Sequence, residues 1–470
     1  MIRWFLGLLL LGCHAAPPPS PTRLAAPPTT APTRALATPP PTRLAAATPP
    51  ALPATAAGRE LTWLLGVLQH GGHADAAELV AHFDATFLAN RPVDRLTAAL
   101  GALAAHLAAM AIDQIESSDE THATLRGAAP EGRFTMALRI DPATGRIVDL
   151  DIAPDPRAAP AATMAEAVAA IRALAPRAQL LVAELDRGAC KPRVWLDADA
   201  ELAIASAFKL YVLLGLGDRI AAGKASWSDA IALRDEWKSL PSGVTQEDPP
   251  GTRLTVRTLA ERMISISDNT AADILLYTVG RRGVEAALRA SHHAAPALDA
   301  PFLATRELFW LKMVAPAAEV ARYLELGEGP RRSYLDRIRG KRPLGAQAQF
   351  DAWTTPRYVD RIEWFASSAD LCRVMSALWS RAQAPATAAL LDVLAVNPGL
   401  SAAQARAWSY VGFKGGSEPG VANTTWLLQR RADQRWFVVT VGLNGPGAFD
   451  EGAVIGAAHA VIELLARDVH

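Results

Sequence analysis

The sequence predicts a protein of the α+β class, with two folded domains behind a long N-terminal tail. The chain has 470 residues, of which 50% are hydrophobic, so it is long enough to fill more than one core. After residue 59, apolar residues first recur at helical spacing and then alternate as they do in strands. Near the C-terminus, consecutive strand-like segments with short connections predict an antiparallel sheet covered by helices.

The first 13 residues predict an export signal. Arg3 supplies one positive charge, and the apolar run after it is too short to span a bilayer as a stable helix. The run ends in Leu10-Leu11-Gly12-Cys13, which resembles a bacterial lipobox, in which the cysteine is lipidated and becomes the new N-terminus. We therefore expect an exported protein that is anchored to the cell envelope by lipid on Cys13. His14 in the next position favours the outer membrane, and a plain secretory signal is the alternative.

Residues 14–58 predict a disordered spacer. They are almost wholly Pro, Ala, Thr, Arg and Leu, and the hexapeptide Pro21–Ala26 is repeated at Pro41–Ala46. Such a segment cannot bury enough apolar surface to fold, and its prolines favour extended polyproline-II structure. The spacer would hold the folded domains away from the membrane.

Residues 59–157 predict a small α+β domain. Leucines recur at helical spacing between residues 61 and 107, with breaks near Gly71-Gly72 and Arg91-Pro92. Strands are expected after these helices, at 113–126, 133–140 and 147–152, with a hairpin turn at 141–146.

Residues 163–470 predict the second, larger domain. It begins with a helix at 163–174 and ends with a helix at 452–467. A second helical block is expected at 256–289, with Ser267, Asp268 and Asn269 near its middle. The expected strands are 180–185, 193–196, 409–413, 423–428 and 436–443.

Ser206 and Lys209 interrupt an apolar run, 203–214, that opens a helix. Positions i and i+3 lie on one helix face, so the lysine amine can approach the serine hydroxyl. A serine needs a neighbouring base to become a nucleophile, and a lysine in apolar surroundings gives up its charge more easily than one in water. The alternative is a helix start with a lysine that extends outward, and S-x-x-K alone does not decide between them.

Two further motifs downstream favour the catalytic interpretation of Ser206 and Lys209 over a plain helix start. Ser267-Asp268-Asn269 is an S-D-N triplet, and Lys414-Gly415-Gly416 is a variant of K-T-G. S-x-x-K, S-D-N and K-T-G in this order are the signature of class A β-lactamases and penicillin-binding proteins. The chain from about residue 175 to 470 therefore resembles class A β-lactamase-like serine hydrolases. The resemblance implies an antiparallel sheet flanked by helices, with an additional all-helical subdomain.

The resemblance also implies roles for the matching residues. Ser206 would be the nucleophile, Lys209 the base for acylation, and Lys414 a second cation whose field disfavours a charged Lys209. Ser267 would relay a proton to the leaving group. The groups implied in substrate binding are Asn269, Gly415, Gly416 and Ser417, with the backbone N–H groups of Ser206 and Ser417 forming the oxyanion hole. Asp268 would brace the turn.

The sequence departs from the class A pattern in two places. Gly415 replaces the threonine of K-T-G, which removes a hydroxyl that would help to bind a substrate carboxylate, and Ser417 is a partial substitute. The E-x-x-L-N motif, whose glutamate activates the deacylating water, is missing. Glu307 is the nearest carboxylate in that region, but no asparagine follows it at the right spacing, so we expect it to be structural. Acylation is therefore better supported than fast hydrolysis.

The first domain resembles the steroid-isomerase or polyketide-cyclase-like module that precedes a class A domain in a two-domain serine hydrolase family, one member of which belongs to clavulanic-acid gene clusters. Isomerase-like chemistry would need a pocketed carboxylate against a proton-accepting partner, for which Asp113, Glu116 and His106 are the candidate members. No spacing singles these residues out, so a structural or substrate-gating role is preferred.

Composition argues against several other partners. There are 47 basic and 47 acidic residues, which gives a net charge of 0 and no field that would favour nucleic acid. The three cysteines form no C-x-x-C pair and the ten histidines no H-E-x-x-H, so neither a metal nor a cofactor is indicated. We expect a monomer.

The leading hypothesis is a secreted serine hydrolase that forms an acyl-enzyme on Ser206, with a β-lactam or a related ester or amide as substrate and slow deacylation. β-Lactam breakdown and antibiotic resistance are the roles that the resemblance implies. A penicillin-binding-protein-like peptidase or an esterase is the alternative. A non-catalytic lipoprotein that binds cell-wall peptide is a third possibility.

Overall fold

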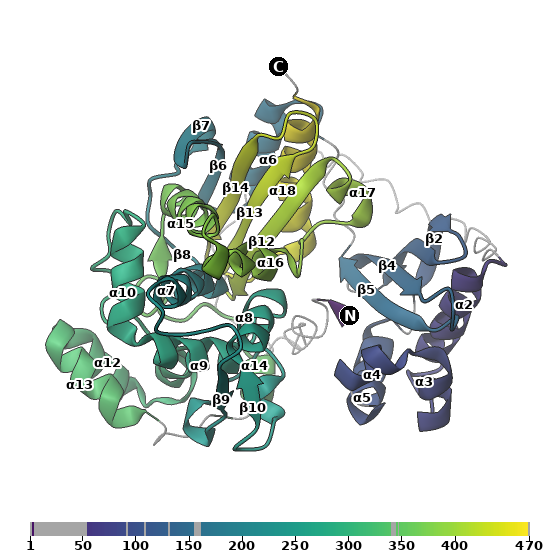
Figure 1. Ribbon diagram of the computed structural model, residues 1–470, viewed down its shortest axis with the longest axis horizontal. Coiled ribbons are helices and arrows are strands. Elements are labelled where there is room, and N and C mark those ends of the chain that lie inside the picture. The colour runs from purple at the N-terminus through teal and green to yellow at the C-terminus, as the bar shows by residue number, and fades with distance from the viewer. Residues whose placement is uncertain are drawn as a thin grey trace, which may run out of the picture.

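The computed structural model describes residues 2–3, 54–90, 93–107, 110–129, 132–154, 161–339, 345 and 347–468. Figure 1 shows the two expected domains, with the smaller N-terminal one on the right. The lipobox at Leu10–Cys13 and the spacer as far as residue 53 lie outside the described residues. None of the described helices combines the length and the apolar character needed to cross a bilayer.

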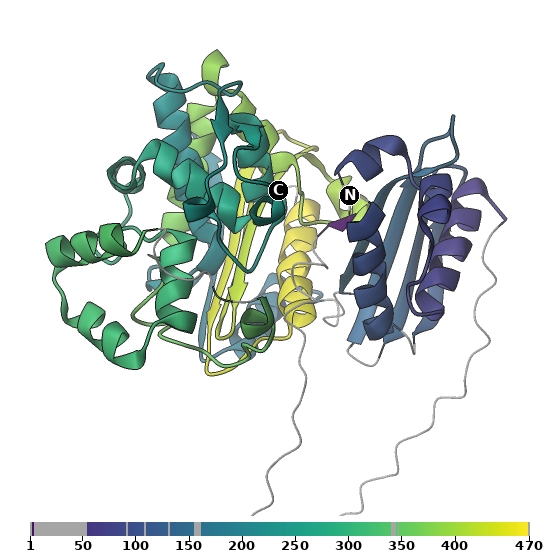
Figure 2. The same ribbon diagram turned by 90° about the horizontal axis from the view of Figure 1, so that it is seen from below.

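The N-terminal domain consists of four helices packed on a sheet (Figure 2). The helices are α2 (Ala56–Gln69), α3 (Ala76–His82), α4 (Ala85–Asn90) and α5 (Val93–Leu107). The sheet order is β1-β5-β4-β3-β2, with β1 (Ile2–Arg3), β2 (Ala111–Ser118), β3 (His122–Ala129), β4 (Gly132–Ile140) and β5 (Ile147–Pro154). All neighbouring strands are antiparallel except β1 and β5, which are parallel.

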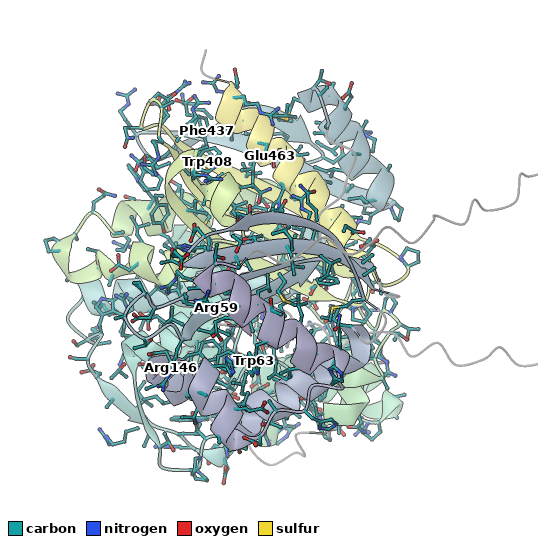
Figure 3. All side chains as sticks on the ribbon, turned by 90° about the vertical axis from the view of Figure 1, so that its right-hand side faces the viewer. Arg59, Trp63, Arg146, Trp408, Phe437 and Glu463 are labelled. Carbon is teal, nitrogen blue, oxygen red and sulfur yellow. A yellow bond between two sulfur atoms is a disulfide. The ribbon has the colours of Figure 1, made fainter. Side chains whose placement is uncertain are left out.

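Side-chain caps fix the starts of the first two helices. The Thr55 side chain caps α2 by accepting from the Gly58 amide, and Asp75 and Glu78 form a capping box on α3. Gly72, with φ of +75°, lies so close to α5 that a Cβ would be 2.3 Å from the Leu100 carbonyl oxygen. Figure 3 shows this domain from its outer side, with Arg59 and Trp63 on α2.

The single strand expected at 113–126 is wrong, because the segment contains two strands, β2 and β3. The Asp119 carboxylate turns the chain by accepting from the backbone amides of Thr121 and His122, at 2.7 and 2.8 Å. The turn contains neither glycine nor proline, which is why the sequence did not reveal it.

The larger domain is built on an antiparallel sheet of order β12-β13-β14-β6-β7. Its strands are β6 (Arg177–Asp186), β7 (Ala189–Leu196), β12 (Trp408–Glu418), β13 (Val421–Arg430) and β14 (Trp436–Asn444). Alternate residues of β6 enter different cores. Leu180 and Val182 pack with α6 (Met164–Leu174) and α18 (Glu451–Arg467), whereas Leu181 and Ala183 pack with α7 (Lys209–Ala221) and α15 (Ser368–Arg381). The sheet is therefore covered on both faces.

The helical subdomain lies beyond one end of this sheet (Figure 1). It contains α8 (Val256–Ser265), α9 (Asn269–Val279), α10 (Arg281–Ala290), α11 (Thr305–Phe309), a π-helical turn (Trp310–Val314), α12 (Ala317–Glu325), α13 (Glu328–Ile338) and α14 (Gln347–Asp351). The small pairs β8 (Leu202–Ala203) with β11 (Phe365–Ala366), and β9 (Ala230–Ala232) with β10 (Arg253–Thr255), and the helices α16 (Ala389–Ala395) and α17 (Ala402–Ala405) complete the domain.

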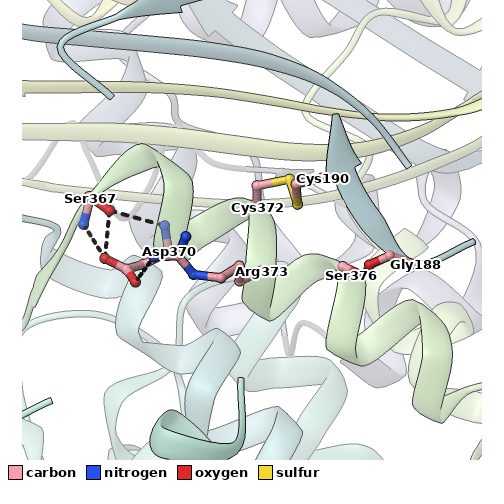
Figure 4. Close-up of a disulfide and its surroundings, with 7 residues drawn as sticks. All are labelled: Gly188, Cys190, Ser367, Asp370, Cys372, Arg373 and Ser376. Atoms are coloured by element: carbon pink, nitrogen blue, oxygen red, sulfur yellow. Dashed lines mark hydrogen bonds and ion pairs between the residues drawn. A yellow bond between two sulfur atoms is a disulfide. The ribbon is translucent and has the colours of Figure 1, made fainter. Parts of the chain in front are cut away.

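A disulfide joins Cys190 of β7 to Cys372 of α15, 182 residues further along the chain (Figure 4). The bond ties an edge strand to a helix that packs on the sheet. The sequence did not predict this pair, because two cysteines so far apart carry no recognisable spacing.

Candidate active site

Ser206 lies where a short strand enters a helix. β8 pairs with β11, and the Ile204 amide donates to the Trp364 carbonyl at 3.0 Å, so the segment 364–366 holds the chain just before Ser206. A single 3₁₀ turn, Ala205–Phe208, then leads into α7. Ala205 has a φ of +43°, which costs energy for a residue with a side chain and is a conformation concentrated at functional sites. The half-buried Ser206 hydroxyl is thereby presented at the start of α7.

Lys209 is completely buried, and its amine touches the nucleophile candidate. Its Nζ lies 3.1 Å from Ser206 Oγ and 2.7 Å from Asn269 Oδ1. The carbonyl oxygen and Oγ of Ser267 are 2.7 and 3.0 Å away. None of these partners is a carboxylate, so the amine has no directly bonded counter-ion. Burial lowers the pKa of Lys209 to about 7, against the weaker opposing fields of Asp268 and Asp273.

The S-D-N triplet occupies a break between two helices, which corrects its expected place near the middle of one helical block. Ser267 has a φ of +56°, so the helix α8 ends before it. The Asp268 side chain then caps α9 by accepting from the Ala271 amide at 2.8 Å. This break directs Ser267 and Asn269 toward Lys209.

Asp268 is a brace, as expected from the sequence. Its Oδ2 accepts from the backbone amides of Val244 and Thr245, both at 2.8 Å, and so fixes the loop that borders the site. Gly243 has a φ of +109°, and a Cβ there would lie 2.3 Å from Asp268 Cγ. The loop can therefore reach this position only with glycine. It also supplies Leu240, whose carbonyl accepts from Asn269 Nδ2 at 2.9 Å and so orients Oδ1 toward Lys209.

Lys414 reaches the same place from the edge strand β12. Its Nζ lies 3.1 Å from Ser267 Oγ and 2.5 Å from the Gly415 carbonyl oxygen, and its side chain is completely buried. Burial, and then the field of Lys209, hold the pKa of Lys414 well below its usual value. The Ser267 hydroxyl is therefore shared between two buried amines.

Gly416 and Ser417 face opposite sides of β12, because successive residues of a strand alternate. A Cβ on Gly416 would lie 2.4 Å from the Ile204 carbonyl oxygen and 2.6 Å from the Ser206 amide nitrogen, so only glycine lets the strand approach the nucleophile. The Ser417 side chain instead hydrogen-bonds the Glu451 carboxyl at the start of α18. A substrate-binding role of the Ser417 hydroxyl, in place of the missing threonine, stays a prediction. The role of the Ser417 backbone N–H in the oxyanion hole also stays a prediction.

Glu307 is held by other groups. Arg281 donates to its two carboxylate oxygens at 2.6 and 3.0 Å, and the Ala304 amide donates at 2.9 Å. Asp273, which the sequence analysis did not single out, accepts from the amides of Thr305 and Arg306 at 2.7 and 2.9 Å. These contacts anchor the segment around Glu307, where the glutamate of the E-x-x-L-N motif would be expected. The position of Asp273 four residues after Asn269, one helical turn further along α9, is the signal that could have identified it.

The two N-terminal candidates whose side chains are described do not form a buried acid site. Asp113 and Glu116 are both exposed on the edge strand β2, and Glu116 pairs with Arg126 at 2.7 Å. The side chain of His106 lies outside the described residues. The structure brings together Ser206, Lys209, Ser267, Asn269 and Lys414, with Gly416 against the nucleophile's backbone.

Solved structures that resemble about two thirds of this chain include two β-lactamases and the protein PBP-A. The β-lactamase from Sphaerobacter thermophilus is 19% identical, with a TM-score of 0.47, and the match covers 66% of this chain and 99% of that one. A β-lactamase from Chitinophaga pinensis is 15% identical, with a TM-score of 0.44 and coverage of 65% and 98%. The protein PBP-A, solved as a point mutant in an acyl-enzyme complex with penicillin G, is 15% identical, with a TM-score of 0.43 and coverage of 67% and 99%.

Sequence profiles match both domains, although no curated protein matches the chain. The profile described as ORF 12 gene product N-terminal matches residues 52–147. The profile described as Beta-lactamase enzyme family matches residues 163–463, which is more than half of the 470 residues. This match agrees with the Ser206–Lys209 contact and the antiparallel sheet, and the chain therefore belongs to the beta-lactamase enzyme family.

Proposed function

We propose that the protein is a serine hydrolase that forms an acyl-enzyme on Ser206, with a β-lactam or a related ester or amide as substrate. The observation that carries this proposal is the Lys209 amine, buried and 3.1 Å from Ser206 Oγ. With a pKa of about 7, a substantial fraction of this amine is neutral near neutral pH and can accept a proton. A serine activated by an adjacent base is a competent nucleophile.

The contacts support a complete acylation step. Ser206 Oγ attacks the substrate carbonyl carbon while its proton passes to Lys209 Nζ. The negative carbonyl oxygen that results is received by the backbone N–H groups of Ser206 and Ser417. The bond to the leaving nitrogen or oxygen then breaks, and this atom takes a proton from Ser267 Oγ, which lies 3.0 Å from Lys209 Nζ and 3.1 Å from Lys414 Nζ. Lys209 returns its proton to Ser267, so both residues are regenerated.

Deacylation is proposed to be slow. The carboxylates around the site are engaged elsewhere, because Asp268 and Asp273 accept from backbone amides and Glu307 is paired with Arg281. A carboxylate tied in this way is poorly placed to activate a water molecule against the ester of Ser206. The second candidate function, a penicillin-binding-protein-like peptidase or an esterase, is favoured by the same contact of Glu307.

Labelling with a fluorescent penicillin, followed by intact-mass measurement, tests the proposal. We expect one adduct per chain in the native protein and none in Ser206→Ala, while Ser228→Ala, which alters an exposed serine, should label normally. Equal labelling of Ser206→Ala would refute the proposal. An adduct that lasts for hours indicates slow deacylation, and rapid return to the free mass indicates a true lactamase. Turnover of short acyl esters, assayed in parallel, distinguishes an esterase from a slowly deacylating penicillin-binding protein and from a true lactamase.

A non-catalytic, cell-wall-binding role predicts a different result. A binding protein would retain affinity for cell-wall peptide in Ser206→Ala and would form no covalent adduct in the native protein. The mutual contacts of Ser206, Lys209, Ser267, Asn269 and Lys414 speak against this role, since binding alone does not need two buried amines around one hydroxyl.

We also propose that the protein is exported and anchored to the cell envelope through lipid on Cys13. The disulfide between Cys190 and Cys372 supports export, because such bonds persist mainly in oxidising compartments. Cys13 is the remaining one of the three cysteines. Metabolic labelling with a fatty-acid analogue should mark the native chain and not Cys13→Ser. Label retained in Cys13→Ser would contradict the lipid anchor.

A further inference from the structure

A second group of buried polar side chains lies on another side of α7, away from the contacts of Lys209. It draws on α7, on α15, on the residue before β8 and on the loop after α10. We call it the acidic cluster, and its members are Glu201, Tyr211, His293, Asp299, Asp370 and Arg373. The ligand atoms of Glu201, His293 and Asp370 all lie within 4.8 Å of one another. Asp299 Oδ2 is 3.8 Å from His293 Nε2.

Several polar atoms in this cluster lack a hydrogen-bond partner among the described residues. The Tyr211 hydroxyl and Asp299 Oδ2 belong to side chains that are only 1% and 4% exposed. The Glu201 carboxyl contacts the Asp370 carboxyl, and its buried Oε2 meets no donor in the described part of the chain. Tyr211 lies within electrostatic range of all three carboxylates of the cluster, and its ring packs edge-on against His293. Buried polar atoms are nearly always satisfied, so unpaired oxygen atoms on Tyr211 and Asp299, both within electrostatic range of Glu201 and Asp370, point to a bound group.

The charges in the cluster do not balance. Glu201, Asp299 and Asp370 are three carboxylates, and Arg373, which donates to Asp370, is the cation among the six members (Figure 4). His293 is neutral, because its Nδ1 accepts from the Ala295 amide at 3.1 Å while Nε2 donates to the Phe365 carbonyl at 2.9 Å. With all three carboxylates ionised the formal sum is 1 − 3 = −2. A divalent cation would neutralise this charge.

We propose that the acidic cluster binds one hard divalent cation, Mg²⁺ or Ca²⁺, through oxygen atoms of Glu201, Asp299 and Asp370. Both ions favour carboxylate oxygens, and water or the Tyr211 hydroxyl can complete their coordination. Zinc fits less well, because both nitrogens of His293 are engaged by the backbone. Glu201 is partly exposed, which gives the ion a route from solvent.

The bound ion would hold the segment that leads to the nucleophile. Glu201 directly precedes β8, and Asp299 Oδ1 accepts from the Phe365 amide of β11 at 2.9 Å. Asp370 accepts from the Ser367 amide at 3.0 Å and caps α15. An ion shared by these three carboxylates would therefore clamp β8, β11 and α15 together. The cluster would then be a positioning element for Ser206, and not part of the reacting site.

The metal content and thermal stability of the intact protein test this inference. Protein treated with EDTA and desalted should take up one equivalent of Ca²⁺ or Mg²⁺, and its Tm should rise by a few degrees with excess ion. Separate titrations with the two ions identify the one preferred, and Zn²⁺ serves as the comparison. No stoichiometric uptake of either ion, with an unchanged Tm, would overturn the inference without any variant being made.

Two variants locate the ion. Asp299→Asn and Glu201→Gln keep the shape of each side chain but remove a charged ligand, so uptake and the Tm rise should both be lost. Asp273→Asn is the matched control, because it alters a buried carboxylate whose oxygens bond backbone amides outside the cluster. Uptake that persists in both cluster variants would place the ion elsewhere and contradict the proposal. Tb³⁺ bound near Tyr211 gives sensitised luminescence. This signal should appear in the native protein only, and it should fall when added Ca²⁺ displaces the Tb³⁺.

Discussion

The amine of Lys209 and the hydroxyl of Ser206 lie 3.1 Å apart, at a point where three segments of the chain meet. The amine is completely buried and is bonded to amide, carbonyl and hydroxyl oxygens, with no carboxylate among them. Because burial without a directly bonded counter-ion destabilises the ammonium form, the pair is arranged to hold a neutral amine next to a serine.

Lys209→Met should remove acylation while keeping the fold. Methionine fills a similar volume but cannot accept the Ser206 proton, so the acylation rate should fall by about 10²–10⁴-fold, the usual contribution of a general base. Stopped-flow measurement with a fluorescent penicillin gives the rate, and near-UV circular dichroism checks the packing. Lys224→Met, an exposed lysine just after α7, should acylate at the native rate. A Lys209→Met rate within a few-fold of the native one would show that another group accepts the proton.

The acylation rate should rise with pH through neutrality. The pKa of Lys209 is about 7, and only the neutral amine can accept a proton. Below that pKa the rate should fall about tenfold for each pH unit, and above it the rate should level off. The second-order acylation rate, measured between about pH 5 and pH 9, gives the profile. A rate that is flat across neutrality would mean that Lys209 does not titrate as the base.

Gly416→Ala should separate β12 from the nucleophile segment. The added Cβ would lie 2.4 Å from the Ile204 carbonyl oxygen and 2.6 Å from the Ser206 amide nitrogen, and both are backbone atoms that cannot turn away. We expect loss of labelling together with a lower Tm. Gly447→Ala is the control, because a Cβ there meets no described atom within 4 Å. Normal labelling of Gly416→Ala would mean that the strand need not approach Ser206 so closely.

The sequence predicted the site better than its surroundings. The contact of Ser206 with Lys209 followed from helical spacing, and S-D-N and K-G-G identified the two segments that complete the constellation. The turn conformation of Ser267, with φ of +56°, was not predicted, because apolar periodicity continues on both sides of it. Motif order thus shows which segments meet, whereas backbone geometry decides how they meet.

Contacts between distant residues that belong to no recognised motif could not be predicted. Cys190 and Cys372 are 182 residues apart, and Glu201, Tyr211, Asp299 and Asp370 come from separate segments. Glu307 was expected to be structural because the motif around it was incomplete, and its pairing with Arg281 supplies the physical reason. Single-sequence patterns report on local periodicity and carry no record of such pairings.

Glu307→Gln should reduce stability and leave deacylation unchanged. The glutamate is 2% exposed and receives two hydrogen bonds from Arg281, so the variant would leave a buried guanidinium without its charge partner. Breaking a buried ion pair costs about 3–5 kcal/mol, which urea unfolding will detect. The lifetime of the penicillin adduct, followed by intact mass, should equal that of the native protein. A greatly prolonged adduct would instead identify Glu307 as the group that activates the deacylating water.

Loss of the disulfide should lower stability more than activity. The bond closes a loop of 182 residues between β7 and α15, and neither cysteine belongs to the segments that carry Ser206 and Lys209. Because a cross-link restricts the unfolded chain, the double variant Cys190→Ser/Cys372→Ser should lose about 2–5 kcal/mol of unfolding free energy. Acylation by fluorescent penicillin, measured well below the Tm, should stay within a few-fold of the native rate. Reductant should lower the Tm of the native protein toward that of the double variant and leave the double variant unaffected. An equal effect of reductant on both proteins would show that the bond does not form in solution.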